Sequence, residues 1–273
     1  VCMNGREWLA RRMDEAGMDY QRYDNSFPRI GDFPKAQKLM DRMQAIRWPK
    51  ALDGMARRLN PAYGEMFRGL DMAYYWSAYQ TEWATDMAFA SSRALAAIYP
   101  PLVRGAIATF ASRDVMRFLG KRSDRRSSGE VVSDYGDRPE GIRVKHLAFG
   151  NSLKVYDKGG SILRIETTIN QPAAFRSYRA SQREPDGEKS WRPMCKGIAD
   201  LYRRAEVSQQ CNNRYSDALA SLDTTTPLGT LAATVCRRVT KDGKRYRALR
   251  PWSEEDQKLL ELLSDGTCVV QGF

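Results

Sequence analysis

The order of predicted elements along this 273-residue chain indicates an α+β fold, with an antiparallel sheet flanked by helices. Three observations support this class. Apolar residues recur with helical spacing towards both ends of the chain, and alternating and β-branched residues dominate its centre. A double glycine joins two of the central strands.

We expect residues 1–70 to form a helical N-terminal segment. Residues 4–20 carry a loose apolar stripe that follows Asn4, a residue type favoured at helix N-caps. A polar loop is expected next, and residues 34–59 return to a helical pattern that Pro49 interrupts.

Residues 71–222 are expected to form the α+β core. The aromatic-rich stretch 74–89 alternates in the manner of a long strand, whereas residues 91–119 return to helical periodicity. Two shorter strand-like stretches lead into a predicted hairpin at 151–170, and residues 196–222 form the clearest helix of the chain.

The loop that closes this hairpin determines which side chains share a face. A two-residue turn at Gly159-Gly160 would place Val155 opposite Arg164 and mix apolar with charged groups. A three-residue loop over 158–160 pairs Val155 with Leu163 and separates the two kinds, so we predict that register. The polar face then carries Lys154, Tyr156, Arg164, Glu166 and Thr168.

This polar face is the candidate site. Glu166 is a candidate ligand for a divalent cation, Mg²⁺ or Mn²⁺, and Lys154 and Arg164 are candidates to hold phosphates. Tyr156 would stack on a base or take part in the chemistry. The alternative interpretation is a solvated sheet face with cross-strand ion pairs, each contributing about 0.2–1 kcal/mol.

A metal site would need a second carboxylate, because a divalent ion requires convergent oxygen ligands. Glu82 and Asp86 lie on one face of the predicted strand 74–89 and are the candidates. Four residues along a strand span about 13 Å, so only one of the two could join Glu166. The alternative is that both are ordinary exposed strand carboxylates.

The charge balance favours a polyanionic partner. Forty-four Lys and Arg against 33 Asp and Glu give a net charge of +11, and such an excess binds polyanions through phosphate neutralisation and counterion release. Arg outnumbers Lys, and its planar fork suits phosphates and base edges. We therefore expect DNA or RNA as the partner, with simple solubility as the alternative explanation of the charge.

Cysteine and histidine usage excludes several chemistries. The five cysteines show no CxxC pair, which argues against a disulfide framework or structural zinc and for reduced thiols in the cytoplasm. His146 is the single histidine, so a two-histidine metal motif is impossible within the chain. No apolar run approaches the ~18–20 residues of a membrane span, and we expect no membrane partner.

Two short motifs in the hairpin carry a resemblance to a known family. VYDK at Val155–Lys158, followed by LRIE at Leu163–Glu166, resembles the YDK … RxE strand pair of rolling-circle replication initiators of plasmids and filamentous phages. In that family a carboxylate-held metal helps a tyrosine to attack a DNA phosphodiester. The match covers about twenty residues, and the two-histidine motif of many members is absent here.

The resemblance implies a role for several residues. Glu166 would hold the metal and Lys158 would contact a phosphate. The nucleophile would be a tyrosine of the helix 196–222, Tyr202 ahead of Tyr215, although Tyr202 could equally be a packing residue. The remaining candidates for nucleic-acid binding are basic residues of the strand before the hairpin and of this helix: Arg143, Lys145, Arg203 and Arg204.

A second resemblance extends over nearly the whole chain, to a group of longer bacterial proteins associated with mobile or repetitive genomic contexts. The matching segments are NGREWLARRM, DVMRFLG, RVKH, KVYDKGGSILRIETTIN and RRAEVSQ. This resemblance implies a mobile-element protein of which the chain is an internal piece, with residues preceding Val1.

Residues 223–273 are expected to form a basic hairpin and a C-terminal helix. The hairpin should turn at Asp242-Gly243, and Ser253 should cap the helix. Together they resemble the start of a winged helix, and a generic amphipathic helix is the alternative.

The sequence therefore predicts a basic nucleic-acid-binding protein. The most specific hypothesis is a metal-dependent strand-nicking or replication-initiator-like enzyme of a mobile element. The alternatives are a DNA- or RNA-binding protein without chemistry and a structural subunit of a ribonucleoprotein. A second carboxylate within about 5 Å of Glu166 would favour the enzyme.

Overall fold

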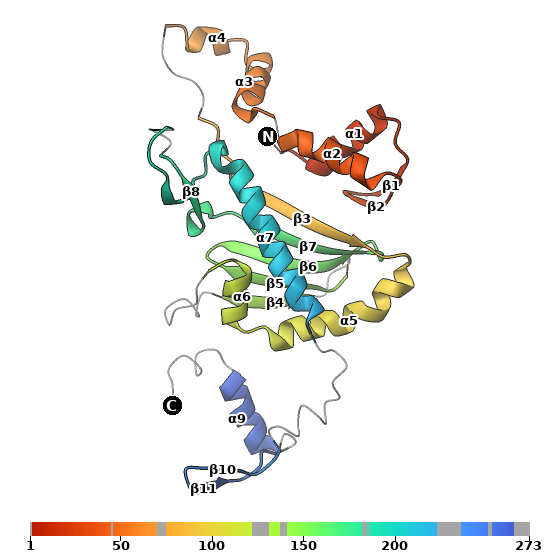
Figure 1. Ribbon diagram of the computed structural model, residues 1–273, viewed down its shortest axis with the longest axis vertical. Coiled ribbons are helices and arrows are strands. Elements are labelled where there is room, and N and C mark those ends of the chain that lie inside the picture. Colours follow the sequence, from red (N-terminus) through yellow and green to blue (C-terminus); the bar gives the residue numbers. More distant parts are fainter. Residues whose placement is uncertain are drawn as a thin grey trace.

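A five-stranded antiparallel sheet with helices packed on it forms the centre of the protein in the computed structural model (Figure 1). The predicted α+β class is therefore confirmed. In sheet order the strands are β3 (Thr81–Ala88), β7 (Ile162–Ile169), β6 (Asn151–Lys158), β5 (Arg143–Ala148) and β4 (Val132–Gly136). The structure describes residues 2–44, 46–69, 75–121, 131–136, 141–181, 184, 186–222, 236–250 and 253–264.

The hairpin β6–β7 is closed by a different loop from the one predicted. Lys158 stays in the strand opposite Ile162, and residues 159–161 form the turn. Gly159 and Gly160 both have positive φ, 68° and 80°, a conformation that glycine adopts without strain. The Asp157 carboxylate accepts a hydrogen bond from Gly160 N at 2.8 Å and holds the turn.

The pairing is consequently shifted by two residues from the predicted register, which was wrong. Tyr156 lies opposite Arg164, and Lys154 lies opposite Glu166. Because a strand alternates its side chains with a period of two, a shift of two leaves each side chain on its predicted face.

Three helices cover one face of the sheet. The longest lies across the strands in Figure 1 and contacts β3 and β7, while the other two contact β4 and β5. The sheet supplies buried aliphatic side chains at alternate positions, among them Leu153, Val155 and Ile165. The helices are α5 (Ser92–Thr109), α6 (Ser112–Phe118) and α7 (Leu201–Ala220).

A buried amide fixes α7 on the sheet. Asn212 Nδ2 donates to Trp83 O at 3.1 Å and to Ile165 O at 3.3 Å, carbonyls of two adjoining strands. Its Oδ1 accepts from Thr167 Oγ1 at 2.7 Å. A buried amide without these partners would cost about 1–3 kcal/mol, so the network favours one position of the helix.

His146 provides a second polar link between the sheet and α7. Its Nδ1 lies 2.8 Å from Ser133 Oγ on β4, and its Nε2 lies 2.9 Å from Tyr215 Oη on α7. Burial lowers the pKa of His146 to about 4. The ring is therefore neutral at physiological pH, with both nitrogens engaged in hydrogen bonds.

The N-terminal residues form a small unit with a core of its own. Leu9, Met13, Phe27 and Leu39 are buried together. The loop expected between the first helices is instead an antiparallel hairpin, in which the Tyr20 ring packs on that of Phe27 with centroids 5.5 Å apart. Its elements are α1 (Gly5–Glu15), β1 (Tyr20–Tyr23), β2 (Ser26–Ile30) and α2 (Phe33–Gln44).

The remaining elements are short. The strand expected at 74–89 is confined to β3, and residue 77 forms only an isolated bridge with residue 197. The expected domain boundaries, near 70 and 222, adjoin residues 70–74 and 223–235, which lie outside the described part. The elements are α3 (Trp48–Leu59), α4 (Tyr63–Met66), η2 (Pro172–Ala174), β8 (Arg176–Arg179), β9 (Ser190–Pro193), η3 (Ile198–Asp200), β10 (Val239–Lys241), β11 (Lys244–Tyr246) and α9 (Glu254–Ser264).

The C-terminal hairpin turns at Asp242-Gly243 as predicted, with β10 paired to β11 and α9 following. A winged helix is not confirmed, since the described residues supply one helix after this hairpin. Among the described helices, none alone has the length and apolar character of a membrane span; α5 and α6 meet that criterion only as a pair bent by 110°.

The depressed pKa of His146 predicts an acid-sensitive fold. The unfolded chain takes up a proton near pH 6.5 and the folded chain only near pH 4, so stability is present above 6.5 and is lost as pH falls through this window. The loss reaches about 3 kcal/mol. Chemical denaturation at several pH values should show a smaller pH slope for His146→Gln than for the wild type, and equal slopes would contradict the assignment.

Candidate functional site

The face of the sheet opposite α7 brings three predicted site residues together. Lys154 Nζ lies 2.6 Å from Glu166 Oε1, across the β6–β7 pair. Tyr156 Oη donates to Glu166 Oε2 at 3.1 Å. Glu166 is 7% exposed, so this carboxylate is buried and both of its oxygens have partners.

The chemistry of this cluster is that of a closed ion pair. Burial and then the adjacent Glu166 carboxylate raise the pKa of Tyr156 well above its ordinary value. The phenol therefore remains protonated at neutral pH and acts as a hydrogen-bond donor. A nucleophilic tyrosine would need the opposite shift.

The residues around Glu166 fit this ion pair better than a divalent-cation site. The ammonium of Lys154 occupies the position beside Oε1 that a cation would take. On the neighbouring strand, Ala84 is the residue opposite Glu166, and the two candidate carboxylates lie two positions to either side of it. In the described part of the chain, no three His, Cys, Asp or Glu side chains converge as metal ligands.

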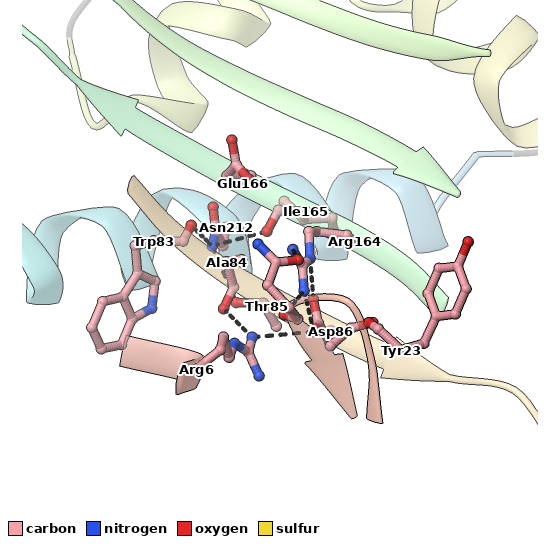
Figure 2. Close-up of polar contacts among 12 residues, drawn as sticks. Arg6, Tyr23, Trp83, Ala84, Thr85, Asp86, Arg164, Ile165, Glu166 and Asn212 are labelled. Carbon is pink, nitrogen blue, oxygen red and sulfur yellow. Dashed lines mark hydrogen bonds and ion pairs between the residues drawn. The ribbon is translucent and has the colours of Figure 1, made fainter. Parts of the chain in front are cut away.

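Each of those two carboxylates has other partners. Glu82 Oε1 accepts from Gln80 Nε2 at 2.7 Å. Asp86 binds two guanidinium groups, and Figure 2 shows those of Arg6 and Arg164 converging on it. In this structure all three carboxylates are engaged by other side chains, and the sharing of one metal ion between Glu166 and either residue stays a prediction.

Arg164, a predicted phosphate ligand, is buried and links the sheet to the N-terminal hairpin. It is 2% exposed, and its guanidinium donates to both oxygens of Asp86, at 2.7 and 2.8 Å. Two further hydrogen bonds of 2.9 Å reach the side-chain and backbone oxygens of Asn25. These bonds leave no open side from which a phosphate could approach, and they attach the N-terminal hairpin to the sheet.

The N-terminal unit covers the neighbouring part of this face as well. Arg6 Nη2 donates to Ala84 O at 3.3 Å. Lys158, the other predicted phosphate ligand of the hairpin, forms an ion pair with Asp24 in the β1–β2 turn. The ring of Tyr23 lies so close to Gly159 that a β-carbon there would be 2.5 Å from it.

The predicted residues of α7 have structural partners and lie across the sheet from Glu166. Tyr202 Oη donates to Ile46 O at 2.8 Å. Arg204 is buried and donates to the carbonyls of residues 78 and 195, at 3.0 and 2.7 Å. Arg203 pairs with Asp200 at 3.2 Å. Tyr215, the second candidate nucleophile, is buried against His146.

Arg143 and Lys145, two further predicted nucleic-acid-binding residues, lie on the strand next to the cluster. They lie on β5 opposite Tyr156 and Lys154. Both side chains are half-buried, and Arg143 Nη2 is 4.0 Å from Asp134 Oδ2 on β4. This part of the face therefore carries three bases, Arg143, Lys145 and Lys154, and two carboxylates, Asp134 and Glu166.

Within the described part of the chain, a dense group of exposed positive charges lies elsewhere, in the hairpin β10–β11 and its flanks, which we call the basic hairpin (residues 236–250). Seven of these fifteen residues are bases and one is an acid, and all seven bases are exposed. They are Arg237, Arg238, Lys241, Lys244, Arg245, Arg247 and Arg250. The sequence pattern identified this hairpin, but none of its residues was chosen as a site residue.

A single buried carboxylate anchors the basic hairpin to α9. Asp256 accepts from Arg247 through two hydrogen bonds, of 2.8 and 2.6 Å, and from Arg250 N at 2.6 Å. Of the seven bases, only Arg247 has an ion pair among the described residues. The other side chains face solvent and are available to a polyanion.

Replacing Arg164 tests its structural role. Arg164→Met leaves the Asp86 carboxylate partly buried with one of its two cations removed, and we expect a loss of about 3–5 kcal/mol in the free energy of unfolding. Limited proteolysis should then cleave within residues 2–30 more readily. In the double variant Arg164→Met/Asp86→Leu the unpaired charge is gone, so part of the stability should return. A stability change below about 0.5 kcal/mol in the single variant would contradict this role.

Comparison of the chain with family models, with curated proteins and with solved structures found no match. The resemblances to replication initiators and to mobile-element proteins therefore stay predictions.

Proposed function

We propose that this protein binds DNA or RNA through the basic hairpin and performs no chemistry on it. The observation that carries the proposal is the density of exposed bases in residues 236–250, where a surplus of six positive charges accounts for more than half of the net charge of +11. Phosphate contacts supply most of the affinity of such surfaces.

The shape of the basic hairpin suits a nucleic-acid backbone. A two-stranded ribbon is among the elements that the major groove of a duplex, about 12 Å wide, admits. Lys241 and Lys244 are cross-strand partners next to the turn, and Arg245 lies opposite Thr240. Positive side chains therefore emerge from both faces of the ribbon, and Tyr246 adds an exposed aromatic ring.

The anchor at Asp256 supports the same proposal. It ties the ribbon to α9 by a two-pronged Arg247 ion pair, which limits the motion of the strands relative to the helix. Less conformational entropy is then lost when the bases are ordered on a phosphate backbone.

Catalysis is the less favoured function because the polar groups of Glu166, Lys154 and Tyr156 bind one another. Its carboxylate is neutralised by Lys154 and its phenol is held protonated, so neither a metal ligand nor a nucleophile is free. The same three residues are explained by the stability of the sheet.

Neutralising the basic hairpin should weaken binding to nucleic acid. The triple variant Lys241→Gln/Lys244→Gln/Arg245→Gln should reduce affinity for labelled duplex and single strands in fluorescence anisotropy. If the three side chains contact phosphates, the slope of log K against log salt should fall by about 2–3.

A matched control removes three exposed bases elsewhere, in Lys38→Gln/Arg42→Gln/Lys50→Gln, with the same change of net charge. This variant should bind with nearly wild-type affinity. Equal weakening by both triple variants would mean that overall charge, not the basic hairpin, is responsible. Absence of binding by the wild type at low salt would overturn the proposed function.

Nuclease assays test the proposal that no chemistry occurs. Labelled single- and double-stranded DNA and RNA, incubated with the protein and Mg²⁺ or Mn²⁺, should remain intact and free of covalent adduct, as in EDTA. Cleavage that is lost in Glu166→Gln and kept in Glu82→Gln would contradict the proposal and restore the enzyme hypothesis.

A further inference from the structure

The hairpin β8–β9, which we call the arm, exposes two aromatic rings side by side. Tyr178 and Trp191 are directly opposite each other in the antiparallel pair. Their ring centroids are 5.7 Å apart with an interplanar angle of 57°. The two residues are 59% and 65% exposed, so both rings present a face to solvent.

The opposite side of the arm is held to the rest of the protein. Arg179 Nη2 donates to Asp200 Oδ2 at 3.2 Å, and Asp200 is buried at the start of α7. The same carboxylate accepts from Cys195 N at 2.9 Å, just beyond the end of β9. Because its inner side is anchored, the arm presents its aromatic side in a defined position.

Basic residues accompany the rings on the outer side. Arg176 lies two positions before Tyr178 and therefore on the same face, and it is exposed. Beyond the arm, Lys196 Nζ lies 5.4 Å from the ring centroid of Tyr79, another exposed aromatic. Lys196 follows β9 in the chain, so a second pair of a cation and an exposed ring involves the segment next to the arm.

Exposed apolar side chains are common singly, but a cross-strand pair of large rings beside cations is the composition of a stacking platform. A base stacked on such a ring contributes about 1–3 kcal/mol, and any base will serve because each has a π-face. In a duplex these faces are already covered by neighbouring bases. The platform therefore favours unpaired bases.

We propose that Tyr178 and Trp191 form a platform on which bases of single-stranded nucleic acid stack, with Arg176 contacting the adjoining phosphate. The inference rests on the proposed nucleic-acid binding and adds a preference for single strands. The two rings are inclined to each other, so each would receive its own base.

The test compares single-stranded and duplex oligonucleotides of equal length in fluorescence anisotropy. The double variant Tyr178→Ala/Trp191→Ala should bind single strands at least about tenfold more weakly, from the loss of one or two stacked bases, and should bind duplex as the wild type does. Trp191→Phe keeps a ring and should retain most of the single-strand affinity. Its fluorescence quenching by single strands should be smaller than that of the wild type.

A matched control, Phe33→Ala/Tyr135→Ala, removes two exposed rings from other elements and should leave both affinities unchanged. Wild-type single-strand affinity in the arm variant would overturn the platform while leaving the proposed function intact. An equal loss on single strands and duplex would overturn the single-strand preference. If the wild type bound neither oligonucleotide, the proposed function itself would fail, which separates the two outcomes.

Discussion

The buried ion pair between Arg164 and Asp86 is the interaction on which the arrangement of this protein depends. A guanidinium that is 2% exposed must have its hydrogen bonds satisfied internally, because an unpaired buried charge is very costly. Asp86 satisfies one side of the fork and Asn25 the other. The hydrogen bonds from Arg164 to Asn25 hold the N-terminal hairpin against β3 and β7. Arg6 provides a second cation beside Asp86. One arginine thus converts a polar sheet face into an interface between two parts of the chain.

The same principle separates structural charge from charge that is available to a partner. On the sheet, positive groups are matched by Glu166, Asp86 and Asp24. Among the described residues, the basic hairpin places six exposed bases without an ion pair in one short segment outside the sheet, where they are solvated by water in the absence of a polyanion. Short hairpins on the periphery suit this use, since their side chains need not contribute to a core. The arm has one anchored side and one side open to solvent, whereas the basic hairpin is exposed on both faces and is anchored only through Arg247 and Arg250 after β11.

The local sequence pattern predicted much of the sheet, and there is a physical reason for each feature that it failed to predict. The alternation of apolar and polar residues in β6 and β7 predicted both faces correctly, because burial strongly favours one set. The register was wrong by two because alternation repeats every two residues and does not distinguish such shifts. The turn resolved it, through two left-handed glycines and the Asp157 side chain. The β1–β2 hairpin was missed because its residues are stabilised by packing on α1 and α2 and by hydrogen bonds to Arg164 of the sheet more than by their own periodicity.

By itself the sequence determined the α+β class, the position of the central hairpin, the turn at Asp242-Gly243 and the excess of positive charge. These properties depend on composition and on neighbours within a few residues. Only the tertiary structure decided which charged side chains are paired within the protein. Arg164, Arg204 and Lys158 are as basic as Lys244 or Arg245, but partners up to 139 residues away in the chain occupy them. Availability to a ligand is a property of what surrounds a side chain in space, and that is decided when distant segments pack together.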